Sequence, residues 1–145
     1  MYQDTITLFN RITADEGDRW IPTVIGGVEL KVDRAAIAAK YGSQSQDRAS
    51  LHIRYEKTAE GIRIADKLWR EPKQWSGMSD SLTFRSGTAF DFFWAGAWDG
   101  DDMIYDADYG PGGFFQHMEN EKDNVFAITS VSKHKLIPHF EILGR

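Results

Sequence analysis

The sequence predicts a mainly β protein: a small β-barrel or sandwich with one or two short helices and long loops. Short segments in which apolar and polar residues alternate recur along the chain, and glycine, proline and small polar residues separate them. Helical composition is confined to a few short stretches. With 145 residues, of which 41% are hydrophobic, the chain fits a single domain spanning residues 1–145 and can bury a hydrophobic core.

The first strands are predicted near the N-terminus. Residues 4–10 alternate with the period of two that is typical of a strand, with Ile6 and Leu8 on one face. Residues 20–33 predict two strands joined by a turn or bulge at the glycine pair Gly26-Gly27, and they include a proline at position 22. This proline suits an edge position, because it has no N–H to donate to a neighbouring strand.

The middle of the chain predicts a short helix and further strands. Residues 33–42 combine an aspartate N-cap, four alanines and a terminal glycine, which is typical of a helix. Residues 49–55 alternate as a half-buried strand, and residues 61–69 predict another strand after a turn at Gly61. Residues 71–78 suit a single helical turn.

The last third of the chain predicts two strand pairs around a helix. Residues 81–96 suggest a hairpin that turns at Ser86-Gly87. Residues 112–124 suit a short helix with two phenylalanines and a methionine on one side. Residues 124–135 and 138–145 predict two final strands, divided at a proline.

Composition excludes several kinds of site and segment. The chain has no cysteine, so disulfides, thiolate nucleophiles and thiolate metal ligands are excluded, and a reducing compartment is favoured. The first residues lack the basic and apolar regions of a signal peptide, and no apolar run is long enough to span a membrane. We therefore expect synthesis in the cytoplasm and no membrane partner.

Acidic side chains are concentrated in one part of the chain. Residues 86–121 contain no Lys or Arg and carry eight acidic residues, a charge of −8, whereas the whole chain has a net charge of −5. The rest of the chain therefore has a charge of about +3. Such a separation influences partner choice rather than fold. The absence of a concentrated basic face disfavours a dedicated nucleic-acid binder.

The acidic residues are densest in residues 97–113, an apparent loop insertion with five aspartates: Asp99, Asp101, Asp102, Asp106 and Asp108. A helix-loop-helix calcium site needs acidic or amide ligands at positions 1, 3 and 5 of its loop, glycine at 6 and glutamate at 12. No alignment of residues 97–113 with these positions satisfies the pattern. An irregular cation site at Asp99, Asp101 and Asp102 stays open, because oxygen ligands tolerate loose geometry. The simpler interpretation is a solvated loop or a loop that faces an interface.

The sequence contains no recognisable catalytic motif, so we expect a protein that is not an enzyme and has no cofactor. The many carboxylates single out no acid pair for glycoside hydrolysis. No serine lies in a nucleophile elbow, and residues 110–113 lack the strand and lysine that flank a phosphate-binding loop. The histidines also lack zinc-type spacing; they are His52, His117, His134 and His139.

Two further features suggest contacts with other chains. Phe92, Phe93 and Trp94 are consecutive, so a strand here presents aromatic side chains to both of its faces. Either both faces are buried within the chain, or a neighbouring subunit covers one of them, since large aromatics favour interfaces. Lys133 and Lys135 lie at a predicted turn, as an ordinary charged hairpin tip or as a contact with an acidic surface or nucleic acid.

The order of these segments resembles a known family. Four stretches carry the resemblance, DTITLFNR, WIPTVIGGVEL, SLTFRSGTAFDFFWAG and DNVFAITSVSKHKLIPHFEILGR. Together they are similar to the small minor-capsid, head-completion proteins in the neck of long-tailed bacteriophages. The match touches roughly half of the chain, and its specificity comes from the collinear order, because each motif alone is a strand pattern.

The resemblance implies a structural virion protein, located in the neck at the head–tail interface and made in the host cytoplasm. It implies a subunit of a hexameric ring whose partners are copies of itself, the head–tail adaptor, and tail or tail-terminator proteins. Genomic DNA would pass the ring without sequence-specific contacts. The implied role is head closure, in which a stopper retains packaged DNA, and the alternative within the neck is a tail-terminator ring subunit. A small metal-binding β domain is the alternative outside it.

The chain also departs from the family's pattern. The usual Gly-Asp before the aromatic strand is replaced by the lengthened stretch SGTAFDFF, and residues 97–113 resemble an insertion. The expected role of the insertion is contact or channel lining, because carboxylates along a DNA conduit repel phosphates. The interface or channel candidates are Phe92, Trp94, Asp99, Asp101, Asp102, Asp106, Asp108, Lys133 and Lys135.

Overall fold

Six strands close into a β-barrel in the computed structural model, which describes residues 2–33 and 48–145. Strands make up 48% of the structure and helix 10%, so the predicted mainly β class is confirmed, with a barrel as the architecture. The helix predicted for residues 33–42 lies, apart from Asp33, outside the described residues.

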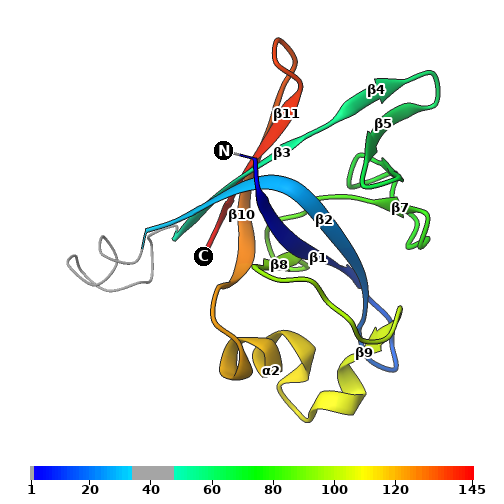
Figure 1. Ribbon diagram of the computed structural model, residues 1–145. Helices are drawn as coiled ribbons and strands as arrows, with labels where there is room; N and C mark the ends of the chain where they lie inside the picture. The colour runs from blue at the N-terminus through cyan, green and yellow to red at the C-terminus, as the bar shows by residue number, and fades with distance from the viewer. Residues whose placement is uncertain (1, 34–47) are drawn as a thin grey trace.

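The barrel strands follow one another in a closed antiparallel circuit (Figure 1). β1 pairs with β8, β8 with β10, β10 with β11, β11 with β3 and β3 with β2, and β2 returns to pair with β1. The strands are β1 (Asp4–Ile12), β2 (Arg19–Val32), β3 (Ala49–Arg54), β8 (Phe92–Trp94), β10 (Val125–His134) and β11 (His139–Gly144).

The long strand β2 pairs first with β1 and then with β3. Its register against β1 shifts opposite Asp4 and Ile6, and Gly27 has a φ of 63°, so the predicted feature at Gly26-Gly27 is a bulge in one continuous strand. Pro22 pairs with β1 on one side, and no described strand pairs with β2 on its other side at this point. This position fits a residue without an N–H, as predicted.

A second, four-stranded sheet follows β3 in the chain. It contains β4 (Glu56–Thr58), β5 (Gly61–Ile64), β6 (Lys67–Trp69) and β7 (Ser81–Leu82), in that order. The single strand predicted for residues 61–69 is therefore wrong. Ala65 and Asp66 have φ values of 51° and 65°, and two positive φ values in succession reverse the chain between β5 and β6.

The hairpin predicted for residues 81–96 is also wrong. β7 belongs to the second sheet, whereas β8 lies between β1 and β10 of the barrel. The loop between them turns at Gly87, where φ is 92°. The single helical turn predicted within residues 71–78 is present, because the Trp75 N–H donates to the Glu71 carbonyl over 3.1 Å.

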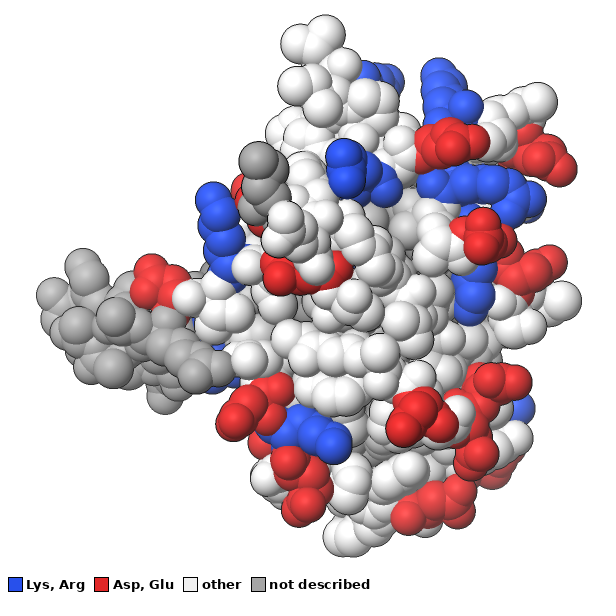
Figure 2. Space-filling model, in the orientation of Figure 1, with Lys and Arg blue, Asp and Glu red and all other residues white. Residues whose placement is uncertain are grey.

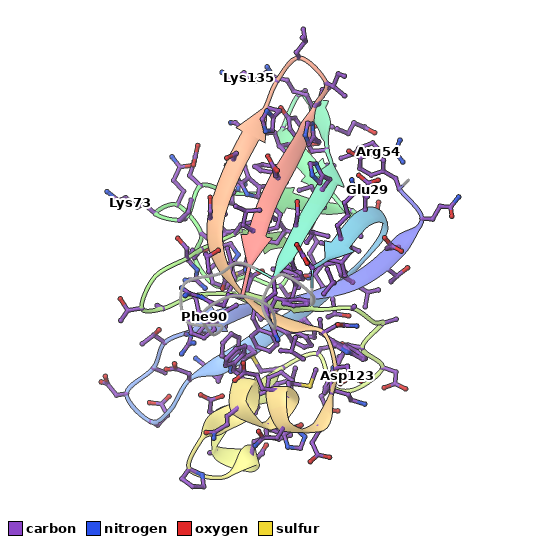
Figure 3. All side chains as sticks on the ribbon, turned by 90° about the vertical axis from the view of Figure 1, so that its left-hand side faces the viewer. Glu29, Arg54, Lys73, Phe90, Asp123 and Lys135 are labelled. Carbon is purple, nitrogen blue, oxygen red and sulfur yellow. The ribbon has the colours of Figure 1, made fainter. Side chains whose placement is uncertain are left out.

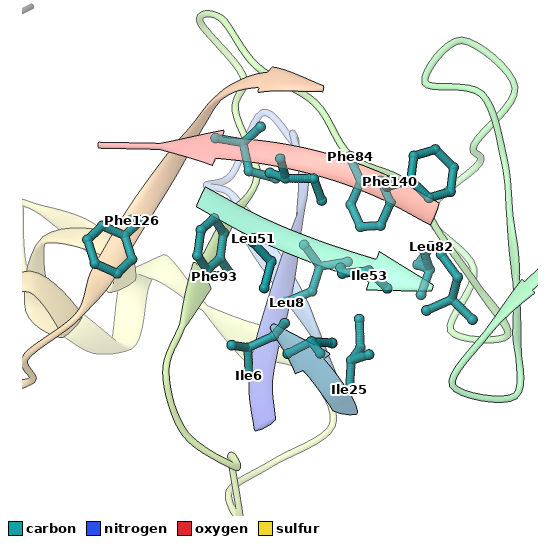
Figure 4. Packing of buried hydrophobic residues seen from close by; sticks show 14 of the residues in the cluster. Ile6, Leu8, Ile25, Leu51, Ile53, Leu82, Phe84, Phe93, Phe126 and Phe140 are labelled. Atoms are coloured by element: carbon teal, nitrogen blue, oxygen red, sulfur yellow. The ribbon is translucent and has the colours of Figure 1, made fainter. Parts of the chain in front are cut away.

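Aliphatic and phenylalanine side chains fill the barrel (Figure 4). Ile6 and Leu8 of β1 point inward, as predicted, and Leu51 and Ile53 do so from β3. Alternate residues of a strand point to the same face, so each of these strands contributes every second side chain to the cluster. Phe93 of β8 joins the same cluster.

A second hydrophobic cluster packs on the other face of β1 and β8. Phe9 and Phe92 stack with ring centroids 4.7 Å apart, and Phe114 meets Phe9 edge-on at 5.2 Å. Phe114 and Met118 come from helix α2 (Gly113–Glu121), where their i, i+4 spacing places them on one face, as predicted. The central part of β1 is therefore buried on both faces. No helix in the described part of the chain combines the length and apolar character that a membrane crossing requires.

Candidate interaction surfaces

The acidic segment, residues 97–113, is anchored to the second cluster. Trp98 packs edge-on against Phe9 and Phe114 at 5.5 and 5.4 Å, and its backbone N–H donates to Thr7 Oγ1 over 3.0 Å. β9 (Ile104–Tyr105) then pairs with the start of β2, and the 3₁₀ helix η1 (Asp106–Tyr109) precedes α2. The predicted loop insertion thus contains two short elements that its aromatic residues hold in place.

Asp106 has a structural role in this segment. Its Oδ1 accepts hydrogen bonds from Trp20 Nε1–H (2.7 Å) and from the Phe114 N–H (2.9 Å). Because Phe114 lies in the first turn of α2, the carboxylate satisfies a helix N–H that has no partner within the helix. Asp106 therefore ties α2 to the barrel wall, a structural role that the sequence did not indicate.

The other four aspartates of the segment are exposed, and we call them the acidic surface: Asp99, Asp101, Asp102 and Asp108. In Figure 2, acidic side chains predominate over the lower part of the visible face, in the region of β9, η1 and α2, whereas most Lys and Arg side chains lie above it. Within residues 2–33 and 48–145, no group of three or more His, Asp or Glu is arranged to hold a metal ion. Asp99, Asp101 and Asp102, the residues of the possible cation site, are therefore not placed together as ligands of one ion.

The aromatic strand β8 is buried on both faces. Phe92 lies in the second cluster and Phe93 in the barrel interior, and both side chains are fully buried. Of the two interpretations of this strand, the one in which its own chain buries both faces therefore holds, and Phe92 is not exposed to a neighbouring subunit. Trp94 is half-buried, and the Lys122 ammonium lies 5.4 Å from its ring centroid.

The β10–β11 hairpin projects from the barrel and carries an apolar end (Figures 1 and 3). We call residues 135–138 the hairpin tip. Leu136 is 97% exposed and Ile137 is 70% exposed. Lys135 lies beside them in the turn, whereas the Lys133 ammonium lies 5.2 Å from the Trp69 ring of the second sheet. The sequence pattern indicated the two lysines as contact candidates but gave no sign that the aliphatic pair after Lys135 is exposed.

Three histidines gather beside the turn of this hairpin, where β10 ends and β11 begins. The rings of His134 and His139 stack with centroids 4.6 Å apart, and the His52 ring lies 5.4 Å from His139. Glu141 is close to two of them, 3.8 Å from His52 Nε2 and 3.6 Å from His134 Nε2. Sequence spacing could not reveal this group, because strand pairing places His134 opposite His139 and His52 opposite Glu141.

A groove of about 430 Å³ lies beside β2 and the β5–β6 turn, and we call it the β2–β6 groove. Lys67 extends into it and donates a hydrogen bond from Nζ to Thr23 Oγ1 over 2.7 Å. Burial lowers the pKa of Lys67, and the negative charges of Asp102 and Asp80 partly oppose that effect. The lining residues are Ile21, Pro22, Thr23, Val24, Ala65, Lys67, Ser79 and Asp102.

A buried ion pair fixes the loop that precedes β8. Asp91 is fully buried and accepts hydrogen bonds from Arg85 Nη2 (2.7 Å) and Nε (3.0 Å). The backbone N–H groups of Arg11 and Arg85 each donate to the same carboxylate over 2.9 Å. Burial raises the pKa of Asp91, and the hydrogen bonds and charge of Arg85 oppose this rise. Both carboxylate oxygens have partners within the chain, so the pair is structural.

Comparison with protein families gives one finding on identity. The model of a family of unknown function, DUF6751, matches residues 1–145. Searches of curated proteins and of solved structures found no match.

Proposed function

We propose that this chain, which belongs to the DUF6751 family along its whole length, is a structural subunit of a bacteriophage neck, in the ring that closes the head. The family has no assigned function. The proposal therefore depends on the collinear motifs and on how the folded chain uses them.

The observation that carries the proposal is where the motifs fall in the fold. The segments that resemble head-completion proteins form β1, β2, β8, β10 and β11, which are five of the six barrel strands. β4, β5 and β6 of the second sheet and the acidic segment lie outside those segments, whereas β7 lies within the third of them. The resemblance thus follows the framework of the barrel, which is the part that subunits of one structural class share.

The exposed surfaces also support an assembly role. The hairpin tip leaves two large aliphatic side chains in solvent, a feature typical of contact sites. In Figure 2 the lower part of the visible face is mainly acidic, while most basic groups lie above it among other acidic ones, and such a difference in charge favours ordered contacts between unlike surfaces. The acidic surface would serve as a contact or channel-lining element, with Trp94, Lys133 and Lys135 as further candidates.

A binding experiment with purified neck components tests the proposal. The full chain is mixed with the portal-proximal adaptor and with tail proteins encoded beside it, and complexes are analysed by sedimentation velocity and electron microscopy. We expect a ring in register with the adaptor ring. Absence of affinity for both partners would contradict a neck role, and binding to the tail alone would identify the tail-terminator alternative.

A further inference from the structure

Five large apolar side chains of the described residues are exposed: Val24, Met78, Tyr105, Leu136 and Ile137. Leu136 and Ile137 form the hairpin tip. Val24 lines the β2–β6 groove, and Met78 is the neighbour in sequence of the lining residue Ser79. Exposed apolar side chains that gather in this way mark contact surfaces.

The tip and the groove are complementary in shape. The tip is convex, and at the end of a projecting hairpin it presents two adjacent aliphatic side chains, Leu136 and Ile137. The groove is concave, and its volume of about 430 Å³ has room for more than one such side chain. Val24 offers an apolar surface there and is itself 42% exposed.

The two surfaces are also complementary in charge. Lys135 stands beside the apolar pair and is exposed. Asp102 lines the groove, and Asp101 precedes it in the chain. The one lysine of the groove, Lys67, is already hydrogen-bonded to Thr23 Oγ1. A lysine arriving with the tip would therefore meet carboxylates at the groove rim.

We propose that the hairpin tip of one copy of this chain inserts into the β2–β6 groove of the next copy. Leu136 and Ile137 pack against Val24, and Lys135 pairs with Asp102. The contact joins two different surfaces, so an open chain of copies has a free tip at one end and a free groove at the other until it closes into a ring. This inference deepens the proposed function and rests on it for the ring, although the contact itself requires only this chain.

Cysteine cross-linking tests the contact directly, because the chain has no cysteine of its own. Ile137→Cys and Val24→Cys variants, distinguished by a mass tag, are mixed in equal amounts and oxidised. A disulfide forms only where Cα atoms approach within about 4.4–6.8 Å. We expect tip–groove dimers to exceed tip–tip and groove–groove dimers at least about fivefold. Only the tip–groove pair of cysteines is held together by the proposed contact, whereas the other pairs meet by collision.

The matched control is Glu60→Cys, which lies at the turn of the β4–β5 hairpin and has a 69% exposed side chain. It should cross-link with Val24→Cys no more than random collision allows. Tip–groove yields equal to this control, or a majority of tip–tip dimers, would overturn the proposal.

A charge exchange provides the second test. Lys135→Glu and Asp102→Lys should each reduce the tip–groove yield, because each places like charges together. Combining Lys135→Glu in the tip copy with Asp102→Lys in the groove copy should restore it. If the combination gives a tip–groove yield as low as either single change, Lys135 and Asp102 do not form an ion pair.

Vesicle sedimentation tests whether the hairpin tip binds a lipid surface instead of the groove. If the wild-type chain binds anionic phosphatidylserine vesicles and Leu136→Ser with Ile137→Ser abolishes that binding, while tip–groove cross-links are absent, the tip contacts lipid and the proposal fails. Cross-links without adaptor or tail binding would retain the contact and reject the neck role. Adaptor binding without cross-links would retain the neck role and reject the tip–groove contact.

Discussion

Asp91 and Arg85 form the ion pair on which the loop before β8 depends. We expect Asp91→Asn to lower the free energy of unfolding by about 3–5 kcal/mol, because removal of one partner leaves the other charge uncompensated. Urea unfolding followed by circular dichroism measures the change. Asp99→Asn is the control: it is exposed and should stay within about 0.5 kcal/mol of wild type.

Asp106 provides a second test at the scale of single residues. Asp106→Ala leaves Trp20 Nε1–H and the Phe114 N–H without their acceptor, so we expect a loss of about 1–3 kcal/mol. The matched change Asp108→Ala, in the same 3₁₀ helix but exposed, should cost much less. Equal losses in thermal unfolding would show that Asp106 is not an anchor.

The five clustered aspartates show why residue roles were only partly predictable. The sequence correctly identifies an acidic segment, and four of its aspartates are exposed. It could not separate Asp106 from the others, because that role is created by Trp20, which lies 86 positions away. The β2–β6 groove was missed for the same reason: its walls come from distant parts of the chain.

Among the elements, the β5–β6 turn offers a direct test of backbone strain. Ala65 and Asp66 both have positive φ, which residues other than glycine and asparagine adopt at a cost. Ala65→Asn combined with Asp66→Gly supplies the residues that such a turn prefers, and we expect stabilisation of about 1 kcal/mol. An unchanged or lower melting temperature would contradict this account of the turn.

The elements that were predicted correctly have strong local patterns. β3, β10, β11 and α2 follow apolar periodicity that matches their buried faces. The β5–β6 turn was missed because its residues, Ala-Asp, are not a turn signature. The separation of β7 from β8 was missed because the stretch between them resembles a hairpin, while the Asp91 ion pair that holds it forms only in the fold.

For the whole molecule, the charge distribution predicts an effect on assembly without an effect on stability. Replacing Asp99, Asp101 and Asp102 together by Asn removes exposed charges only, so the melting temperature should change little. Assembly with neck partners or retention of DNA should be impaired. A melting temperature that falls by many degrees would contradict an assignment of these residues to the surface.

Calcium addition tests the metal-binding alternative on the same variants. A ligand that binds the native state raises the melting temperature as its concentration exceeds the dissociation constant. Because the three carboxylates form no ligand set, we expect no calcium-dependent rise for the wild type or the triple variant. A rise in the wild type that the variant abolishes would support the cation site.

β8 is only three residues long, yet it is the partition between the two hydrophobic clusters. Phe93 and Phe92 occupy opposite sides of that partition, so a movement of β8 that loosens one cluster also displaces the aromatic ring that β8 contributes to the other. The helical end and the barrel should consequently melt as a single cooperative unit. Calorimetry should record one endotherm, and Phe92→Ala should accelerate hydrogen exchange on both sides of the strand.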